Sequence, residues 1–278
     1  MGTDKRERQK ANKAAKQEAE RKAEARARRI RTIRNAVLAG IAIVVIMVLI
    51  SVLSGCASEP AAESDAGGAT TEVAADAAGP VGDGTCPPAE GAERTIDFTS
   101  SFAGCIDPAK TYTATIETTE GTVTVALDTE RTPETTDNFV SLARYGYYDG
   151  TDLFRTEAAT GIIQGGSPHT QDNSDPGPGY TIDDEGLPFS SDDYGPGTLA
   201  MARTSAPNSA SGQFFLLAND GGRYLGDPAQ LGDAAGTYAV FGQVTEGLDV
   251  LEAIAALDDG TGRPTQPVQI TSVTITES

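Results

Sequence analysis

The sequence predicts a mainly β fold for the C-terminal part of the chain: a closed β-barrel with α-helices plugging its ends. Apolar and polar residues alternate along residues 112–118, 122–127 and 268–275, which is typical of half-buried strands. Residues 119–121 separate the first two segments and favour a hairpin. Because strands dominate and only two segments have a helical pattern, closing the sheet is the expected way to remove its free edges.

The two predicted helices have recognisable boundaries. Thr132 and Pro133 are a good N-cap and a good first residue for a helix over residues 133–145, and Gly146 ends it. The second amphipathic segment covers residues 247–256. The region holding these elements is long enough to enclose one hydrophobic core.

A pair of strands and the loop between them form the centre of the predicted domain. A Gly-Pro-Gly turn at residues 195–197 precedes an apolar strand over residues 198–202. A polar loop covers residues 204–212, and a second apolar run covers residues 213–218. The loop side chains are too small to cover the strands, so the strand ends should form an accessible platform.

Charge is distributed unevenly along the chain. Residues 1–35 hold 13 Lys and Arg against 5 Asp and Glu, whereas the remainder holds 8 against 35. Nucleic-acid binding needs a basic footprint, so the acidic remainder argues against a nucleic-acid partner. The basic head has few large apolar residues, and we expect a solvated cytoplasmic helix rather than a nucleic-acid-binding arm.

An apolar segment without charge follows the head, from Ala36 to Leu53. Its 18 residues would span ~27 Å as a helix, close to the hydrocarbon thickness of a membrane, so we expect a transmembrane helix over residues 36–54. The positive-inside rule then predicts a single-pass protein of the cell membrane with an extracytoplasmic C-terminal domain. Alternatively, residues 53–56 match a bacterial lipoprotein signal, and a lipid on Cys56 would anchor the cleaved chain at the same outer face.

A linker and a short extension precede the domain. Residues 55–85 are mostly small or acidic and cannot bury enough apolar surface to offset their ordering entropy, so we expect a disordered linker. Cys86 and Cys105 lie 19 residues apart, and an exported compartment permits a disulfide between them. That bond would pin residues 86–109 as an extension of the domain; the alternative is two free thiols.

Several kinds of site can be excluded. The chain has one histidine, His169, so a histidine-rich zinc site is unavailable and a histidine-based triad is disfavoured. No phosphate-binding loop or dinucleotide fingerprint occurs, and the acidic clusters lack the spacing of a calcium loop. We therefore expect no metal and no cofactor. Arg155 stands out as a scarce cation among apolar residues, with an ion-paired surface arginine as the simpler alternative.

A series of short motifs runs along residues 111–275. They are Tyr148-Asp149-Gly150 followed by Arg155, Gln164-Gly165-Gly166, Gly177-Pro178-Gly179-Tyr180, Asp184-Glu185, Met201-Ala202, Gln213-Phe214-Phe215, Leu225, and Tyr238 to Gly242. Their order resembles the cyclophilin family of peptidyl-prolyl cis/trans isomerases, in a membrane-tethered bacterial, actinobacterial-like form. The resemblance implies an eight-stranded antiparallel barrel capped by two helices over residues 110–278.

The resemblance also implies an activity, the acceleration of X–Pro bond rotation in exported proteins without a cofactor. It implies catalytic roles for three residues. Arg155 would donate a hydrogen bond to the proline nitrogen of the twisted amide, and Gln164 would hold both Arg155 and the substrate carbonyl. Phe215 would form the apolar seat for the proline ring. The other implied substrate contacts are Ile162, Ala202, Arg203, Gln213, Tyr224, Leu225 and Tyr238. The expected partners are proline-containing polypeptides, bound by a monomeric domain.

The chain departs from the family beside the pocket. Gly161 stands where the family usually has an aromatic residue, and one extra residue lies between Arg155 and Gln164, which leaves the register there open by one. Two functions therefore remain. Arg155, Gln164 and Phe215 together favour an isomerase, whereas Gly161 favours a non-catalytic module or chaperone that binds prolyl segments.

Overall fold

The computed structural model describes residues 81–278. They belong to the second of two units of the chain, Glu72–Ser278. The basic head, the apolar segment, Cys56 and most of the predicted linker lie outside the described residues. Among residues 81–278, none of the helices combines the length and the apolar character needed to cross a membrane.

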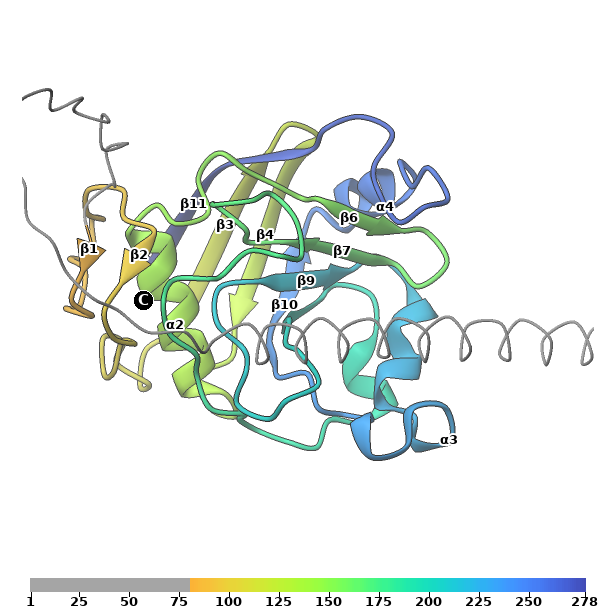
Figure 1. The fold of residues 1–278 in the computed structure, drawn as a ribbon, viewed down its shortest axis with the longest axis horizontal. Helices are drawn as coiled ribbons and strands as arrows, with labels where there is room; N and C mark the ends of the chain where they lie inside the picture. The colour runs from red at the N-terminus through yellow and green to blue at the C-terminus, as the bar shows by residue number, and fades with distance from the viewer. Residues whose placement is uncertain (1–80) are drawn as a thin grey trace, which may run out of the picture. The chain divides into compact units, whose positions relative to one another are not determined.

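Nine strands form one antiparallel sheet in the order β5-β11-β3-β4-β10-β8-β9-β7-β6 (Figure 1). The segments with alternating sequence form three of these strands, and β3 pairs with β4 in the predicted hairpin. The strands are β3 (Tyr112–Thr118), β4 (Gly121–Leu127), β5 (Thr151–Asp152), β6 (Arg155–Glu157), β7 (Ile162–Gly165), β8 (Thr198–Met201), β9 (Phe214–Leu217), β10 (Val240–Glu246) and β11 (Gln269–Glu277).

The sheet is curled, because its two edge strands are consecutive in the chain. Only Leu153 and Phe154 separate β5 at one edge from β6 at the other. No ladder joins β5 to β6 among residues 81–278, so a curled nine-stranded sheet takes the place of the expected closed eight-stranded barrel. The strand count is higher because the extended segment 151–157 divides at Leu153 and Phe154: β5 pairs with β11, whereas β6 pairs with β7.

Both predicted helices are present, as α2 (Pro133–Arg144) and α4 (Leu248–Ala255). A third α-helix that we did not expect, α3 (Pro228–Leu231), is a single turn. Three 3₁₀ turns, η1 (Ser191–Tyr194), η2 (Asp220–Gly226) and η3 (Gly232–Ala234), connect the shorter strands. Gly146 follows α2 with φ +61°, a left-handed conformation that glycine adopts without strain.

The N-terminus of α2 is capped from outside the helix. Thr132 precedes the helix as predicted, but its hydroxyl faces the carbonyls of Asp128 and Val240 instead of capping. The backbone N–H groups of Glu134 and Thr135 donate to the carboxylate of Glu185, at 3.0 and 2.9 Å. A negative charge at this end of a helix is favourable, so Glu185 ties the loop before η1 to α2.

The buried side chains form two clusters. The larger one joins α2 to the sheet, where Phe139 packs against Phe214 and Phe241 with ring centroids 5.7 and 5.2 Å apart. The smaller one contains side chains of β7, β8 and β9 and of the segments packed against them. It consists of Ile162, Phe189, Tyr194, Ala200, Phe215, Leu217, Leu225 and Ala239.

An extension over residues 81–109 packs against α2. Its two short strands, β1 (Val81–Gly82) and β2 (Asp97–Phe98), pair in parallel, so ordered structure begins inside the segment that we expected to be linker. The predicted Cys86–Cys105 disulfide is present. The Cys105 amide donates to the Asp137 carboxylate on α2 at 3.0 Å, and the Phe98 ring lies 5.1 Å from the Tyr145 ring.

Removing the disulfide is expected to destabilise the domain. Closing this loop restricts the unfolded chain by about 3 kcal/mol in the chain-entropy model, so replacing both Cys86 and Cys105 by Ser should lower the thermal midpoint by roughly 6–12 °C. The reduced native protein should have the same thermal midpoint as the double variant. Equal midpoints for the oxidised native protein and the double variant, or two alkylatable thiols in the native protein, would contradict the expectation.

Candidate active site

Three predicted catalytic residues lie in a row across three neighbouring strands. Arg155 on β6 is the register partner of Gln164 on β7, and Gln164 is in turn the partner of Phe215 on β9. Residues directly opposite in antiparallel strands direct their side chains to the same face of the sheet. Strand pairing alone therefore brings these three side chains together.

The pairing shows which residues face each other on either side of the extra residue. Residues 158–161 connect β6 to β7, and Gly161 lies in this turn with φ +72°. A Cβ on Gly161 would lie 2.7 Å from the backbone nitrogen of Asn219. An aromatic side chain does not fit here, and Ile162, which is 4% exposed, forms this part of the pocket wall instead.

A chain of hydrogen bonds orients Arg155. The guanidinium donates from Nη1 to Oε1 of Gln164 at 2.9 Å. Both N–H groups of the Gln164 amide are also used, since Nε2 donates to Oδ1 of Asn173 and to Oε1 of Gln213, each at 2.9 Å. Gln164 is thus built to hold Arg155, and contact with a substrate carbonyl would require one of these bonds to be displaced.

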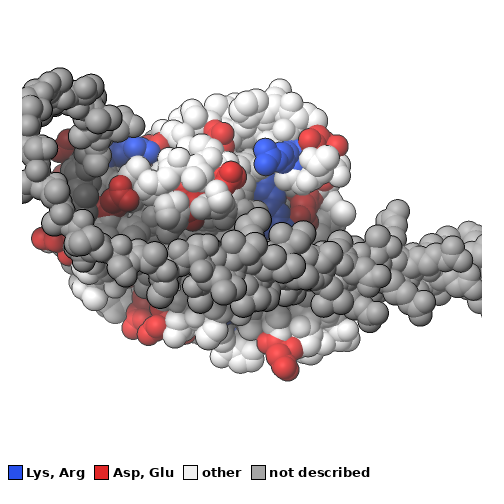
Figure 2. Space-filling model, in the orientation of Figure 1, with Lys and Arg blue, Asp and Glu red and all other residues white. Residues whose placement is uncertain are grey.

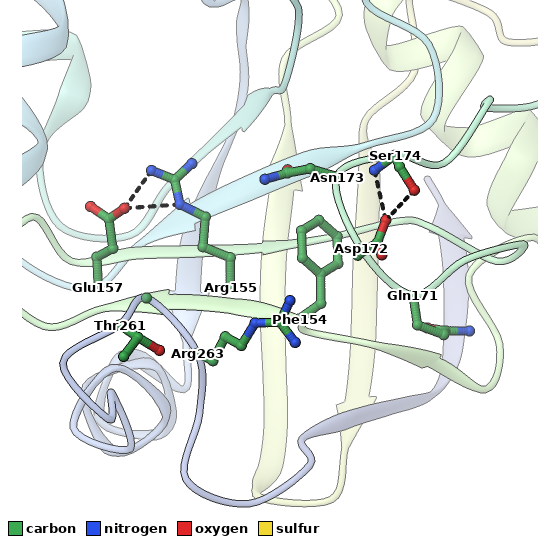
Figure 3. Close-up of a pocket in the computed structure, with 10 residues that line it drawn as sticks. Phe154, Arg155, Glu157, Gln171, Asp172, Asn173, Ser174, Thr261 and Arg263 are labelled. Atoms are coloured by element: carbon green, nitrogen blue, oxygen red, sulfur yellow. Dashed lines mark hydrogen bonds and ion pairs between the residues drawn. The ribbon is translucent and has the colours of Figure 1, made fainter. Parts of the chain in front are cut away.

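Glu157, which the sequence analysis did not single out, contacts the other edge of the guanidinium. Its Oε1 accepts a hydrogen bond from Nε of Arg155 at 2.9 Å and a second one from Nη2 (Figure 3). A guanidinium has five N–H groups, so three are engaged and one on each of Nη1 and Nη2 has no partner among residues 81–278.

A pocket of about 170 Å³ adjoins this row of residues. Phe215 and Leu225 form its apolar side together with Ile162, and each of the three is 4% exposed. The ring of Tyr238 meets that of Phe215 edge to face, with centroids 5.6 Å apart. Every predicted contact except Gln213 lines this pocket: Arg155, Ile162, Gln164, Ala202, Arg203, Phe215, Tyr224, Leu225 and Tyr238, with Asn173 added.

The pocket also has polar groups at its rim. Burial raises the pKa of Tyr224, and the nearby negative charge of Glu157 raises it further, so its hydroxyl remains protonated at neutral pH. The guanidinium of Arg203 is occupied elsewhere, with bonds to Asp184 and to the carbonyls of Ala206 and Thr237. The backbone amide of Ala202 donates to the Gln213 carbonyl at 2.9 Å, so this N–H group is not free to bind substrate.

Two further depressions continue the pocket on either side. One of about 410 Å³ contains Phe154, Glu157 and Arg263 and shares Arg155 and Asn173 with the pocket (Figure 3). The other, of about 330 Å³, shares Gln164, Asn173, Ala202 and Arg203 with it. Basic side chains gather over β6 on the face shown in Figure 2. A groove of three connected depressions suits an extended polypeptide better than a compact small molecule.

The one histidine lies outside this groove. His169 has Asp175 beside one ring nitrogen and Asp97 beside the other, both at 3.1 Å, and so connects the extension to the loop after β7. Among residues 81–278, no three His, Cys, Asp or Glu side chains are grouped closely enough to hold a metal ion. The groups in the pocket are an oriented guanidinium, amides and apolar walls, which can bind a ring and donate hydrogen bonds.

Comparisons with known proteins identify the family. Residues 113–275 match the family described as cyclophilin type peptidyl-prolyl cis-trans isomerase. Peptidyl-prolyl cis-trans isomerase cyp18 of Streptomyces antibioticus is 38% identical over 170 residues, which cover 59% of this chain and 98% of that protein. Peptidyl-prolyl cis-trans isomerase B of Escherichia coli is 33% identical over 174 residues, covering 59% and 99%.

A solved structure is similar as well. The Cryptosporidium parvum cyclophilin type isomerase in the presence of the dipeptide Ala-Pro is 26% identical, with a TM-score of 0.49 over 60% of this chain and 99% of that one. Of the two functions left open by the sequence, the named relatives support the isomerase. Since the family match covers more than half of the chain, the chain belongs to the cyclophilin family and is a peptidyl-prolyl cis-trans isomerase.

Proposed function

We propose that Arg155 accelerates X–Pro rotation by donating a hydrogen bond to the proline nitrogen in the twisted amide. Rotation breaks amide resonance and meets a barrier of about 18–20 kcal/mol. In the twisted state the nitrogen becomes pyramidal and accepts a hydrogen bond that the planar amide nitrogen accepts poorly. A donor that acts only in the twisted state lowers the barrier without binding either planar isomer more tightly.

One observation carries this proposal: the oriented guanidinium lines the same small pocket as the apolar seat. A proline ring against Phe215, Ile162 and Leu225 would have Arg155 at the polar side of the pocket, with two N–H groups that no described residue engages. Gln164 supports the proposal because it holds Nη1 from the neighbouring strand. Each ~1.4 kcal/mol of selective stabilisation of the twisted state gives a tenfold rate increase.

We further propose that the substrates are exported proteins and that the enzyme works at the outer face of the cell membrane. The charge contrast between residues 1–35 and the remainder supports this orientation, and the apolar residues 36–53 supply an anchor. The Cys86–Cys105 bond is consistent with an oxidising compartment. A lipid on Cys56 is the alternative anchor and leads to the same location.

Replacing Arg155 by Ala is expected to lower kcat/KM on a prolyl tetrapeptide on the order of 100-fold, the usual effect of deleting a donor used only in the transition state. Peptide affinity and the thermal midpoint should change little, because the side chain is one-third exposed. Arg155→Lys should recover little activity, since an ammonium lacks the planar fork held by Gln164 and Glu157. Native activity in Arg155→Ala with an unchanged melt would refute the assignment.

Replacing Phe215 by Ala should produce a different kinetic signature. Phe215 is 4% exposed and forms the apolar side of the pocket, so its loss should raise KM for the prolyl peptide as well as lower kcat. Binding of a non-isomerisable prolyl peptide, measured by calorimetry, should weaken for Phe215→Ala and not for Arg155→Ala. The same affinity loss in both variants would contradict the separate roles of Phe215 in binding the ring and of Arg155 in donating the hydrogen bond.

The location can be tested by protease accessibility. Protease added to intact cells should remove a fragment containing residues 81–278 and leave cytoplasmic marker proteins untouched, because the basic head is expected to remain inside. A domain that stays protected until the cells are lysed would show that the proposed orientation is wrong.

A further inference from the structure

Glu157 is the carboxylate that contacts Arg155, and strand geometry places it there. Successive side chains of β6 alternate between faces, so Arg155 and Glu157 share one face while Thr156, which is fully buried, points to the other. One carboxylate oxygen, Oε1, receives both Nε and Nη2 of the guanidinium (Figure 3). Glu157 lines the depression beside the pocket and not the pocket itself, so any effect on the substrate passes through Arg155.

Glu157 is itself held in place by the turn that follows it. Its second oxygen, Oε2, accepts a hydrogen bond from the hydroxyl of Thr160 at 2.9 Å. The turn is closed by a bond from the Gly161 amide to the Glu157 carbonyl at 2.8 Å, and it is fastened to the neighbouring chain by a bond from Ala218 to Gly161 at 2.8 Å. The turn that contains Gly161 therefore holds the Glu157 carboxylate in a fixed position.

The guanidinium is therefore anchored at two separate edges. Gln164 holds Nη1 from β7, while Glu157 holds Nε and Nη2 from β6. One anchor would still allow the guanidinium to swing about the Gln164 bond, and a long side chain that is 33% exposed has freedom to do so. Two anchors fix the plane of the group and the direction of its two remaining N–H groups.

The same contact occupies the edge that a free anion would use. Nε and one Nη form the fork with which arginine binds carboxylates and phosphates bidentately. Both partners of the pair are about one-third exposed, 33% for Arg155 and 31% for Glu157, so solvent and dissolved ions can reach them. Because Nε and Nη2 already donate to Glu157, these two groups are not available to a dissolved anion.

We infer that Glu157 is a positioning residue of the isomerase: it fixes the plane of the Arg155 guanidinium for the twisted amide and keeps dissolved anions from capturing it. This inference rests on the proposed role of Arg155. Glu157 acts on the rate of rotation through the direction of the Arg155 donors. The affinity for the planar prolyl peptide does not depend on it.

The experiment compares Glu157→Gln and Glu157→Ala with the native protein on an uncharged prolyl tetrapeptide. We expect kcat to fall about tenfold in Glu157→Ala, a loss that a misdirected catalytic group readily causes, with KM within twofold. Glu157→Gln, which keeps one acceptor oxygen, should recover part of this loss. The matched control is Glu246→Gln, which removes the same charge from an exposed position at the far end of β10 and should leave kcat unchanged.

A second measurement adds inorganic phosphate at constant ionic strength. Phosphate should inhibit Glu157→Ala at concentrations that leave the native enzyme and Glu246→Gln unaffected. Native kcat in Glu157→Ala, a change confined to KM, or equal phosphate sensitivity in all variants would overturn the inference. These results differ from failure of the proposed function, which would show as native activity in Arg155→Ala; thermal melts of every variant exclude a loss of folding as the cause.

Discussion

The arrangement of the pocket depends on the hydrogen-bonded register of β6, β7 and β9. Arg155, Gln164 and Phe215 face one another because each is the register partner of the next. A shift of β7 by one residue would turn Gln164 to the opposite face and place either Ile163, a fully buried core residue, or Gly165 opposite Arg155. The contacts between individual side chains are consequences of this pairing.

The pocket combines a rigid apolar side with a polar side of hydrogen-bonded side chains. The apolar side belongs to the smaller buried cluster, so Phe215, Ile162 and Leu225 are fixed by packing from below. On the polar side, hydrogen bonds run from Thr160 through Glu157, Arg155 and Gln164 to Asn173 and Gln213. The proposed role of Arg155 in the rotation needs no nucleophile, only an apolar site for the proline ring and a fixed donor.

The central row of the pocket could be predicted because Arg155, Gln164 and Phe215 lie on strands, and strand pairing then determines their neighbours. Gln213 was expected in the pocket but lies beside it, one hydrogen bond from Gln164. Glu157 could have been found from the alternation of β6, since residues two apart share a face. Asn173 has no such signal, because it lies in a polar loop without periodicity that only the tertiary structure brings to Gln164.

The fold was predictable to a similar degree, and the errors in its prediction have physical causes. The alternating segments identified β3, β4 and β11, but sequence alternation does not reveal where a ladder is interrupted, as at Leu153 and Phe154. Thr132 occupies the N-cap position as predicted, but Glu185, which is distant in the sequence, accepts the N–H bonds that a capping side chain would accept. Long-range contacts of this kind replace local preferences without leaving a local signature.

The disulfide determines how the domain would bear tension. A pull on the chain at Val81 would pass from Cys86 directly to Cys105 and from there to β3, because the covalent bond is the shorter path. The covalent path bypasses the backbone of residues 87–104, which would receive load only through hydrogen bonds such as those between β1 and β2. Under the proposed N-terminal anchoring, the disulfide would direct tension into the start of β3 and away from β6, β7 and β9, which form the pocket.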